Sequence, residues 1–266
     1  MNLQGQTAVI TGSGSTGSGR AIARRFAREG CNVVVSDIDD LGGSETVRII
    51  EAGGGRAAFC RCNVAVADEV RNLIQFAEQT FGPLKVFVNN ASGPPYRPDR
   101  PLDFWDEIIQ TELLGTMHGT RFAIDAMRRS GGGSIVNMSS ISALWHGRRK
   151  PGSPAYDAAK AAVLRLTTGL AWLGEKENIR VNCFAPGWIA SDGPRSYWES
   201  LTPDERRAND VPSRLLELNE VADAVLRLAT DESLAGRVLV WWSEDSPGLI
   251  PWRDPGYTHL ETEPRP

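Results

Sequence analysis

The chain has 266 residues, and its 29 basic and 33 acidic side chains give a formal net charge of -4. With 41% hydrophobic and 23% charged residues, the composition argues against disorder, and the slight negative charge gives no general attraction to nucleic acid or to an anionic membrane. No stretch approaches the ~20 uncharged apolar residues of a spanning helix, and no export signal is visible, so we expect a cytoplasmic protein.

The residues that most often bind metals are few and scattered. No pair of cysteines has the C-x-x-C spacing of a zinc site, and we expect reduced thiols and no metal. The four cysteines and three histidines are Cys31, Cys60, Cys62, Cys183, His118, His146 and His259.

Short apolar runs alternate with helical patterns along the whole chain. The predicted strands are Thr7–Thr11, Asn32–Asp37, Ala57–Arg61, Val86–Asn89, Ser134–Met138, Ile179–Phe184 and Arg237–Trp241. The predicted helices are Gly19–Glu29, Ala67–Phe81, Phe104–Arg129, Tyr156–Glu177 and Glu220–Ala229. This alternation predicts a single α/β domain over residues 1–266, with a three-layer, doubly wound sheet of about seven parallel strands. A polar insert at 192–216 and a Trp- and Pro-rich tail at 243–266 break the pattern.

The first predicted strand runs directly into a glycine-rich turn and then into a helix. Glycines let the backbone turn sharply and approach a pyrophosphate, and the helix N-terminus offers free N–H groups to the phosphates. Between a strand and a helix this turn indicates a dinucleotide site. Its candidate residues are Gly12, Gly14, Gly17, Ser18 and Gly19.

Asp37 ends the second predicted strand, 18 residues after Gly19 (37 − 19). A carboxylate at this position accepts hydrogen bonds from the ribose hydroxyls of a dinucleotide and repels a 2′-phosphate. We therefore expect NAD rather than NADP as the cofactor.

Tyr156 and Lys160 lie four residues apart in a helical pattern and so share one helix face. An ammonium near a phenol lowers the pKa of the phenol, which makes the tyrosine a usable acid and base for the proton of an alcohol. Ser139 and Ser140 follow a predicted strand, at the sheet edge where ligands bind in such folds.

Together these motifs resemble the short-chain dehydrogenase/reductase family, over residues 5–240. The resemblance implies a Rossmann-type fold with Ser140, Tyr156 and Lys160 as the catalytic triad, Tyr156 and Lys160 also binding the cofactor, and a homo-oligomer, either a tetramer or a dimer. It further assigns Asn63 and Val64 to adenine, and Pro186, Gly187, Ile189 and Ser191 to the nicotinamide carboxamide. The family motif N-N-A-G is matched by Asn89-Asn90-Ala91-Ser92, which assigns Asn90 and Ala91 to the cofactor site and places Ser92 at the position of the glycine.

Three features depart from the family pattern. Glu112 stands where the family has an Asn that anchors a water of a proton relay. At the site, it is expected either to serve in that relay or to pair with Lys160 and weaken the effect of Lys160 on Tyr156. The alternative is that Glu112 points away from the site and is only part of the helix surface. The gap between Ser140 and Tyr156 is longer than usual, and the family motif V-D-G-G is replaced by Val240–Asp245.

Aromatic and basic side chains in these atypical segments have two interpretations each. In the longer gap, Trp145 and His146 are either a wall of the substrate pocket or a loop anchor, and Arg148, Arg149 and Lys150 are either a solvated loop tip or an attraction for an anionic substrate. Trp188 precedes the insert, which is a substrate lid by resemblance, and Tyr197 and Trp198 lie within it; these aromatics suit either an apolar or ring-bearing substrate or packing of the lid helix. Trp241, Trp242 and Trp252 suit a buried interface.

The sequence thus predicts an NAD-dependent oxidoreductase that moves hydride between a secondary alcohol and its ketone. Two alternatives stay open at this point. One is a non-catalytic NAD-binding regulator on the same fold, and the other is a lyase or epimerase that uses hydride transfer transiently. The expected partner is a small-molecule substrate, with no nucleic acid and no membrane.

Overall fold

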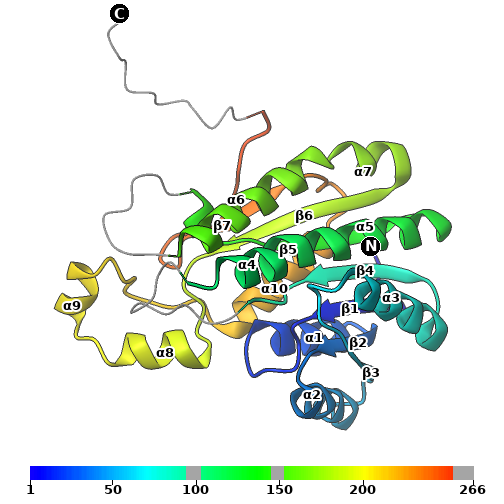
Figure 1. Cartoon of the computed structure of the whole chain (residues 1–266), viewed down its shortest axis with the longest axis horizontal. Helices are drawn as coiled ribbons and strands as arrows, with labels where there is room; N and C mark the ends of the chain where they lie inside the picture. Colours follow the sequence, from blue (N-terminus) through cyan, green and yellow to red (C-terminus); the bar gives the residue numbers. More distant parts are fainter. Residues whose placement is uncertain (94–102, 145–152, 254–266) are drawn as a thin grey trace, which may run out of the picture.

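The computed structural model describes residues 1–93, 103–144 and 153–253. A central sheet has the strand order β3-β2-β1-β4-β5-β6-β7-β8 (Figure 1). The strands are β1 Thr7–Thr11, β2 Asn32–Asp37, β3 Arg56–Arg61, β4 Leu84–Asn89, β5 Gly133–Met138, β6 Ile179–Pro186, β7 Val238–Trp241 and β8 Gly248–Leu249. Neighbours from β3 to β7 pair in parallel, as the sequence predicts, and the expected α/β doubly wound fold is confirmed.

The eighth strand was not among the seven that the sequence predicts. β8 comes from the tail and pairs antiparallel with β7, where Leu239 faces Leu249 and Val240 faces Gly248. Two residues are too short a run to show a strand periodicity, so pairing with β7, rather than local preference, makes this strand. It covers the outer edge of β7.

Helices cover both faces of the sheet. They are α1 Ser18–Arg28, α2 Asp40–Ala52, α3 Ala67–Phe81, α4 Trp105–Ile108, α5 Thr116–Arg129, α6 Pro154–Gly169, α7 Trp172–Glu177, α8 Asp192–Glu199, α9 Pro203–Ala208 and α10 Leu218–Thr230, with a 3-10 turn, η2, at Ile141–Leu144. Two differences from the sequence prediction stand out. α2 was not expected, and the insert at 192–216 contains α8 and α9 instead of irregular chain.

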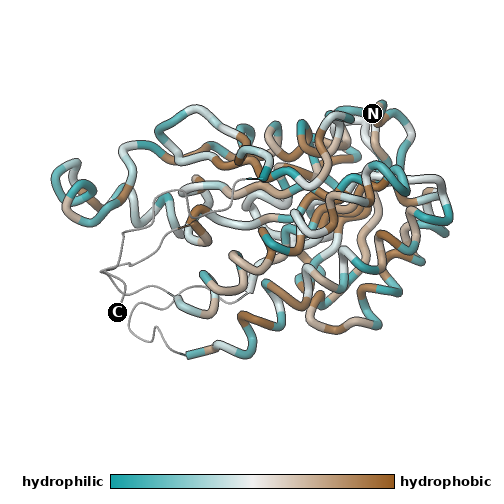
Figure 2. The backbone as a smooth tube through the Cα atoms, turned by 90° about the horizontal axis from the view of Figure 1, so that it is seen from above, coloured by the Kyte–Doolittle hydropathy of each residue, from teal (hydrophilic) through white to brown (hydrophobic). Residues whose placement is uncertain are grey.

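Two hydrophobic clusters hold the three layers together. On one face, Ile22 and Phe26 of α1 pack with Val225 of α10 against the sheet. On the other face, Leu73 of α3 and Met127 of α5 pack against it. Figure 2 shows the result as hydrophobic segments running through the middle of the molecule, with hydrophilic turns outside.

The long helix predicted over Phe104–Arg129 is not regular. α4 passes into a π-helical segment, η1 Ile109–Gly115, and then into α5. The wider turn places Glu112 inward, and the side-chain hydroxyl of Thr116 donates to the Glu112 carbonyl at 2.8 Å. Such π-helical segments are rare and occur frequently at functional sites.

The carboxyl ends of β1, β4, β5 and β6 meet at one edge of the sheet, the side where α8 and α9 project in Figure 1. In the strand order, β1 and β4 are adjacent, and the connections from these two strands turn to opposite faces. Ligands bind at such a switch point in doubly wound sheets. Among the described residues, no helix is long and apolar enough to cross a membrane.

Candidate active site

The glycine-rich turn after β1 is closely packed against the turn after β4. Gly12 has a φ of +64°, and a Cβ there would lie 2.6 Å from the Cα of Ala91. A side chain at Gly19 would meet the carbonyl of Gly12. Gly12 therefore needs glycine for both conformation and space, and Gly19 needs it for space.

The N-terminus of α1 opens beside this turn. α1 begins at Ser18, and its N-cap residue, Gly17, has no side chain to accept from the first N–H groups. A Cβ at Gly17 would make only ordinary contacts, 3.6 Å from the Ser15 hydroxyl and 4.0 Å from the Ser191 Cβ. Free N–H groups and a positive helix end fit a pyrophosphate.

Asn90 braces the glycine-rich turn rather than pointing away from it. Its side-chain amide donates to the carbonyls of Thr11 at 3.0 Å and Gly12 at 3.1 Å, and its side-chain oxygen accepts from the Ser18 hydroxyl at 2.8 Å. The N–H of Ala91 donates to the Thr11 hydroxyl at 3.1 Å. The Asn90 amide groups are thus used to shape the site that was assigned to the cofactor.

Asp37 lies at the end of β2 and faces the turn. One carboxylate oxygen accepts from the N–H of Gly14 at 2.8 Å, and the other accepts from the N–H of Asp39 at 3.1 Å. A Cβ at Gly14 would lie 2.9 Å from the Asp37 carboxylate carbon, so only glycine allows this approach. Each oxygen keeps a further lone pair, which fits the ribose hydroxyls of a dinucleotide.

Asn63 and Val64 follow β3, on the adenine side of the expected site. The side-chain oxygen of Asn63 accepts from the N–H of Ala65 at 3.0 Å, which fixes that oxygen in a turn. Val64 is buried and packs against Gly115. A Cβ added at Gly115 would lie only 2.7 Å from the Val64 side chain. The turn after β3 is thereby joined to the end of η1.

Tyr156 and Lys160 lie on one face of α6, as predicted. The helix begins after Ser153, whose hydroxyl accepts from the N–H of Tyr156 at 3.4 Å. The Lys160 ammonium lies 5.4 Å from the centre of the Tyr156 ring. Tyr156 is partly buried, and a side-chain hydrogen bond with Ser140 lowers the pKa of its hydroxyl.

The two serines after β5 have different places. Ser139 is buried, and its hydroxyl donates to the carbonyl of Lys160 at 2.9 Å. Ser140 faces the Tyr156 hydroxyl and also accepts from the N–H of Ser142 at 3.2 Å. Ser139 therefore anchors α6 to the sheet, and Ser140 is the serine within reach of a reacting oxygen.

Glu112 reaches Lys160 directly from η1. One carboxylate oxygen, Oε2, lies 2.7 Å from the Lys160 ammonium, and both side chains are almost fully buried, at 2% and 5% exposed. Lys160 also donates to the carbonyl of Met138 at 2.9 Å. Of the two roles left open for Glu112, the structure shows the ion pair, because this distance leaves no space for a water between the two groups.

The charges of this cluster shift one another. Burial alone would raise the pKa of Glu112, but the Lys160 ammonium and the hydrogen bonds from Ser92 and Gly93 outweigh it and hold that pKa below its usual value. For Lys160, burial lowers the pKa, and Glu112 together with Tyr156 raises it to a net value above the ordinary one.

The pKa of Tyr156 corrects a sequence-based expectation. Lys160 does lower this pKa, as expected, but burial and the Glu112 carboxylate raise it by more, and the net pKa lies above the usual value for tyrosine. The reason is that the buried carboxylate offsets much of the positive charge that the phenol would otherwise feel.

The motif after β6 closes the site opposite Tyr156. Pro186 ends β6, and a Cβ at Gly187 would collide with the Ser243 hydroxyl, which also accepts from the N–H of Trp188 at 2.9 Å. Ser191 then precedes α8 as its N-cap residue, with no side-chain cap. Ile189 pairs in a bridge with Leu216, so both ends of the insert are joined.

The aromatic residues of the insert pack with one another. Trp188 stacks on Tyr197 with ring centres 6.1 Å apart, and the Arg206 guanidinium lies 3.4 Å above the Trp198 ring. In the tail, Trp252 is 62% exposed, and the Arg237 guanidinium lies 5.3 Å from the centre of its ring. Trp145, His146, Arg148, Arg149 and Lys150 lie outside the described residues.

Sequence reasoning missed three side chains of this region. Thr16 donates to the Asp192 carboxylate at 2.6 Å and joins the glycine-rich turn to α8. Ser243 holds the Gly187–Trp188 peptide, and Ser92 donates to Glu112 at 2.6 Å. Of these three, only Ser92 could have been noticed in the sequence, because it stands at the glycine position of the N-N-A-G motif.

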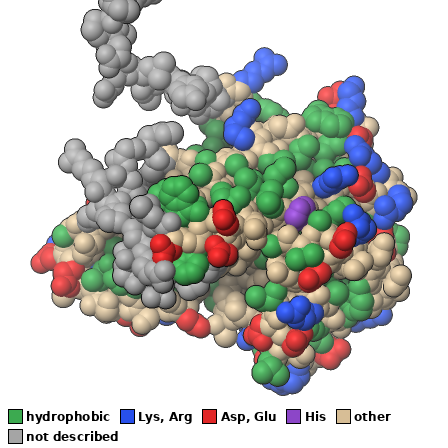
Figure 3. Space-filling model, in the orientation of Figure 1, with side chains coloured by type: hydrophobic (Ala, Val, Ile, Leu, Met, Phe, Trp, Pro, Cys, Tyr) green, Lys and Arg blue, Asp and Glu red, His purple; other side chains and the backbone are tan. Residues whose placement is uncertain are grey.

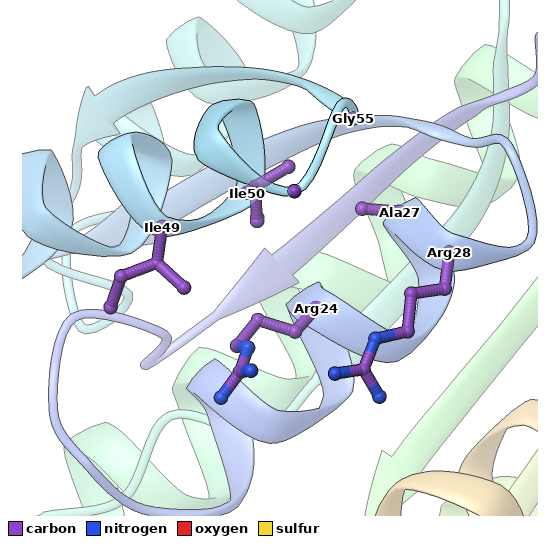
Figure 4. Close-up of a pocket in the computed structure, with 7 residues that line it drawn as sticks. Arg24, Ala27, Arg28, Ile49, Ile50 and Gly55 are labelled. Carbon is purple, nitrogen blue, oxygen red and sulfur yellow. The ribbon is translucent and has the colours of Figure 1, made fainter.

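A second pocket lies away from this site, between the ends of α1 and α2 (Figure 4). These helix ends are at the amino edge of the sheet, opposite the catalytic side chains. The pocket is lined by Arg24, Ala27, Arg28, Ile49, Ile50, Gly53 and Gly55.

Comparison with known proteins decides the family. The short chain dehydrogenase family model matches residues 6–201. The chain belongs to the short-chain dehydrogenase/reductase family. This is a family of oxidoreductases that use nicotinamide cofactors.

Several members of the family are similar over most of their length. The 7alpha-hydroxysteroid dehydrogenase of Escherichia coli K12 is 33% identical over 90% of this chain and 93% of its own. The 3beta-hydroxysteroid dehydrogenase 1 of Eggerthella lenta is 37% identical over 87% of this chain and 89% of its own. A solved 7alpha-hydroxysteroid dehydrogenase, complexed with NADH and 7-oxo glycochenodeoxycholic acid, superposes with a TM-score of 0.80 at 30% identity, over 91% and 94% of the two chains.

Proposed function

We propose that this protein is an NAD-dependent dehydrogenase that moves hydride between a secondary alcohol and its ketone. The observation that carries this proposal is the meeting of Ser140, Tyr156 and Lys160 at the carboxyl edge of the sheet, beside a glycine-rich turn suited to a dinucleotide. An acid or base, a hydroxyl donor and a buried cation are what the removal of an alcohol proton requires.

Each side chain has a distinct role in this proposal. Tyr156 takes the alcohol proton during oxidation and returns it during reduction. Ser140 donates a hydrogen bond to the substrate oxygen and stabilises the charge that develops there. Lys160 lowers the pKa of Tyr156 and binds the nicotinamide ribose. The nicotinamide ring, when bound, accepts or supplies the hydride.

Glu112 weakens the effect of the Lys160 charge on Tyr156. As the direct partner of Lys160, it holds the ammonium in place and offsets part of its charge. Tyr156 is therefore a weaker acid than it would be beside an unpaired lysine. We infer that alcohol oxidation rises with pH to an alkaline plateau.

The test of the function is NADH production from a panel of secondary alcohols, diols, hydroxysteroids and borneol-type alcohols. The substrate panel follows the named relatives, and the stacked Trp188 and Tyr197 favour ring-bearing members. Stoichiometric NADH with one class supports a dehydrogenase. NAD binding without any turnover would instead indicate a regulator, and product formation without net NADH would indicate a lyase or epimerase.

Tyr156→Phe removes only the proton-transfer group. We expect NAD affinity, measured by protein fluorescence, to be unchanged and turnover to fall by roughly 100-fold or more. A variant that keeps more than about a tenth of the wild-type rate would show that Tyr156 is not the acid and base.

NAD preference follows from Asp37, whose carboxylate would repel a 2′-phosphate. Ile38, next in the chain, is 60% exposed and can be replaced by a cation without disturbing the core. We expect Asp37→Ala/Ile38→Arg to lower the ratio of kcat/KM for NAD to that for NADP by about 10-fold or more. The matched control is Asp40→Ala, which removes an exposed carboxylate of α2 and leaves the ratio unchanged.

We also propose a homo-oligomer, either a dimer or a tetramer. Trp105 of α4, Leu114 of η1 and Met117 of α5 are each 39–47% exposed, and Figure 3 shows apolar side chains gathered on this face of the molecule. Exposed apolar groups of this kind favour association. Light scattering on the purified protein measures the mass, and a mass of 29 kDa would contradict the proposal.

A further inference from the structure

Two departures from the family motifs contact each other. Ser92 replaces the glycine of the N-N-A-G motif, and Glu112 replaces the asparagine of the next helix. In the structure the Ser92 hydroxyl donates to Glu112 Oε1 at 2.6 Å, and the N–H of Gly93 donates to the same oxygen at 2.8 Å. Oε2, the other oxygen, faces the Lys160 ammonium.

We propose that Ser92 is a positioning residue for the catalytic lysine, acting through Glu112. The hydroxyl and the backbone N–H fix one carboxylate oxygen after β4, which leaves the other aimed at Lys160 on α6. The turn after β4 is therefore connected to the catalytic helix by one buried side chain. The kinetic part of this inference rests on the proposed function, and the stability part does not.

The geometry explains why a serine is useful here. A buried carboxylate needs donors for both oxygens, since an unpaired oxygen in the interior loses the hydrogen bonds of water. Lys160 occupies Oε2, and without Ser92 the backbone of Gly93 would be the remaining donor described for Oε1. Ser92 thus keeps Glu112 ionised and oriented at pH values where an exposed carboxyl would begin to take up a proton.

Other titratable and charged groups lie on the elements packed around Glu112. Lys160 and Tyr156 of α6 both have raised pKa values, and burial raises the pKa of Cys183 on β6, behind Lys160, to about 12. Asp157 acts on Tyr156 only weakly. On the helices next to Glu112, the charged residues Asp106 and Glu107 of α4 are exposed, and His118 of α5 turns to the carbonyl of Val64.

The first test is the acid limb of the pH–rate profile for ketone reduction. Loss of the Ser92 hydroxyl lets Glu112 take up a proton at higher pH, which leaves Lys160 without its counter-charge. In Ser92→Ala we expect the acid limb to move to higher pH by about one pH unit. In Ser92→Thr, which keeps the hydroxyl, we expect the acid limb to stay where it is in the wild type. Equal shifts in both variants, or none in either, would overturn the proposal.

The second test needs no turnover and uses urea unfolding of the cofactor-free protein. The lowered pKa of folded Glu112 stabilises the protein above the ordinary carboxyl pKa, and this contribution is lost as pH falls through the folded value. The stability deficit of Ser92→Ala should therefore be largest at neutral pH and shrink on acidification. A deficit that is the same at every pH would show a merely structural role.

Two further variants complete the design. Ser92→Gly restores the family residue and replaces Ser92→Ala in these tests if the alanine variant does not fold. We expect the same shift of the acid limb for it. In a Glu112→Asn background the acid limb should no longer respond to Ser92→Ala, because the group through which Ser92 acts is gone. A full response in that background would overturn the inference even if the single variant behaves as expected.

Discussion

Two buried cations of this protein are stabilised in different ways. Lys160 is paired with the Glu112 carboxylate at 2.7 Å. Arg180, on β6, is also buried, but it donates to backbone carbonyls, those of Ala229 at 2.7 Å and Asp231 at 2.8 Å. These carbonyls lie at the C-terminal end of α10, where a helix leaves acceptors unpaired and carries partial negative charge.

The comparison shows that this fold can bury a cation without an ion pair to a carboxylate of the described residues. Burial lowers the pKa of Arg180, although the charges of Glu232 and Asp231 oppose this, whereas the pKa of Lys160 is raised. The need to bury Lys160 therefore does not explain Glu112. Its more specific effect is on the neighbouring phenol, whose pKa it raises.

The largest expected effect comes from removing the paired cation. Lys160→Met leaves Glu112 as an uncompensated buried charge, so we expect a loss of about 3–5 kcal/mol in the free energy of unfolding and of most turnover. Urea unfolding measures the loss in the free energy of unfolding, and the double variant Lys160→Met/Glu112→Gln should recover part of that loss. The control is Lys176→Met, an exposed lysine, with a change within about 0.5 kcal/mol. A Lys160→Met protein as stable as this control would contradict the ion pair.

The intermediate effect comes from the cation bonded to carbonyls. Arg180→Met leaves two helix-end carbonyls without their donor, and we expect a loss of about 1–3 kcal/mol in the free energy of unfolding. Because Arg180 has no ion pair with a carboxylate in residues 1–93, 103–144 and 153–253, this loss should be nearly the same at pH 5 and at pH 8. Turnover per folded molecule should be close to that of the wild type. A strong effect of Arg180→Met on the pH–rate profile would contradict the proposed difference between Arg180 and Lys160.

The smallest expected effect is a shift in the pH–rate profile. Tyr156 must lose its proton to accept one from an alcohol, so a raised pKa moves the rising limb of oxidation to alkaline pH. Glu112→Asn removes the negative charge, and we expect the limb to move to lower pH by about one pH unit without loss of activity. Glu107→Gln, an exposed neighbour on α4, is the control. An unmoved limb in Glu112→Asn would mean that Glu112 does not act on Tyr156.

Much of the fold could be predicted because local patterns and global architecture agree. The apolar run Val33–Val35 reads as a strand covered on both faces, and it is one. β8 escaped prediction because its two residues depend on β7 and not on their own preferences. α2 escaped because Gly42 and Gly43 weaken its helical pattern, while Gly43 is needed for close packing against Phe59.

The site was predictable at the level of motifs but not of contacts. Tyr156, Lys160 and Asp37 follow from spacing within single elements. The ion pair of Glu112 depends on the π-helical turn, and the bond between Ser92 and Glu112 joins residues that are 20 apart in the chain. The sequence offered the two interpretations of Glu112, and only the packing of η1 against α6 distinguishes them.

The π-helical segment η1 also limits how many residues the chain can have between α4 and α5. Deletion of one residue between Ile109 and Thr111 would let α4 and α5 run as a single regular α-helix, with better local hydrogen bonding. The same deletion would turn one part of the helix by about 100° relative to the other, and Glu112 would no longer face Lys160. An exposed position such as Gln110 can therefore accept another residue type, whereas the number of residues in this segment cannot change without loss of the ion pair between Glu112 and Lys160.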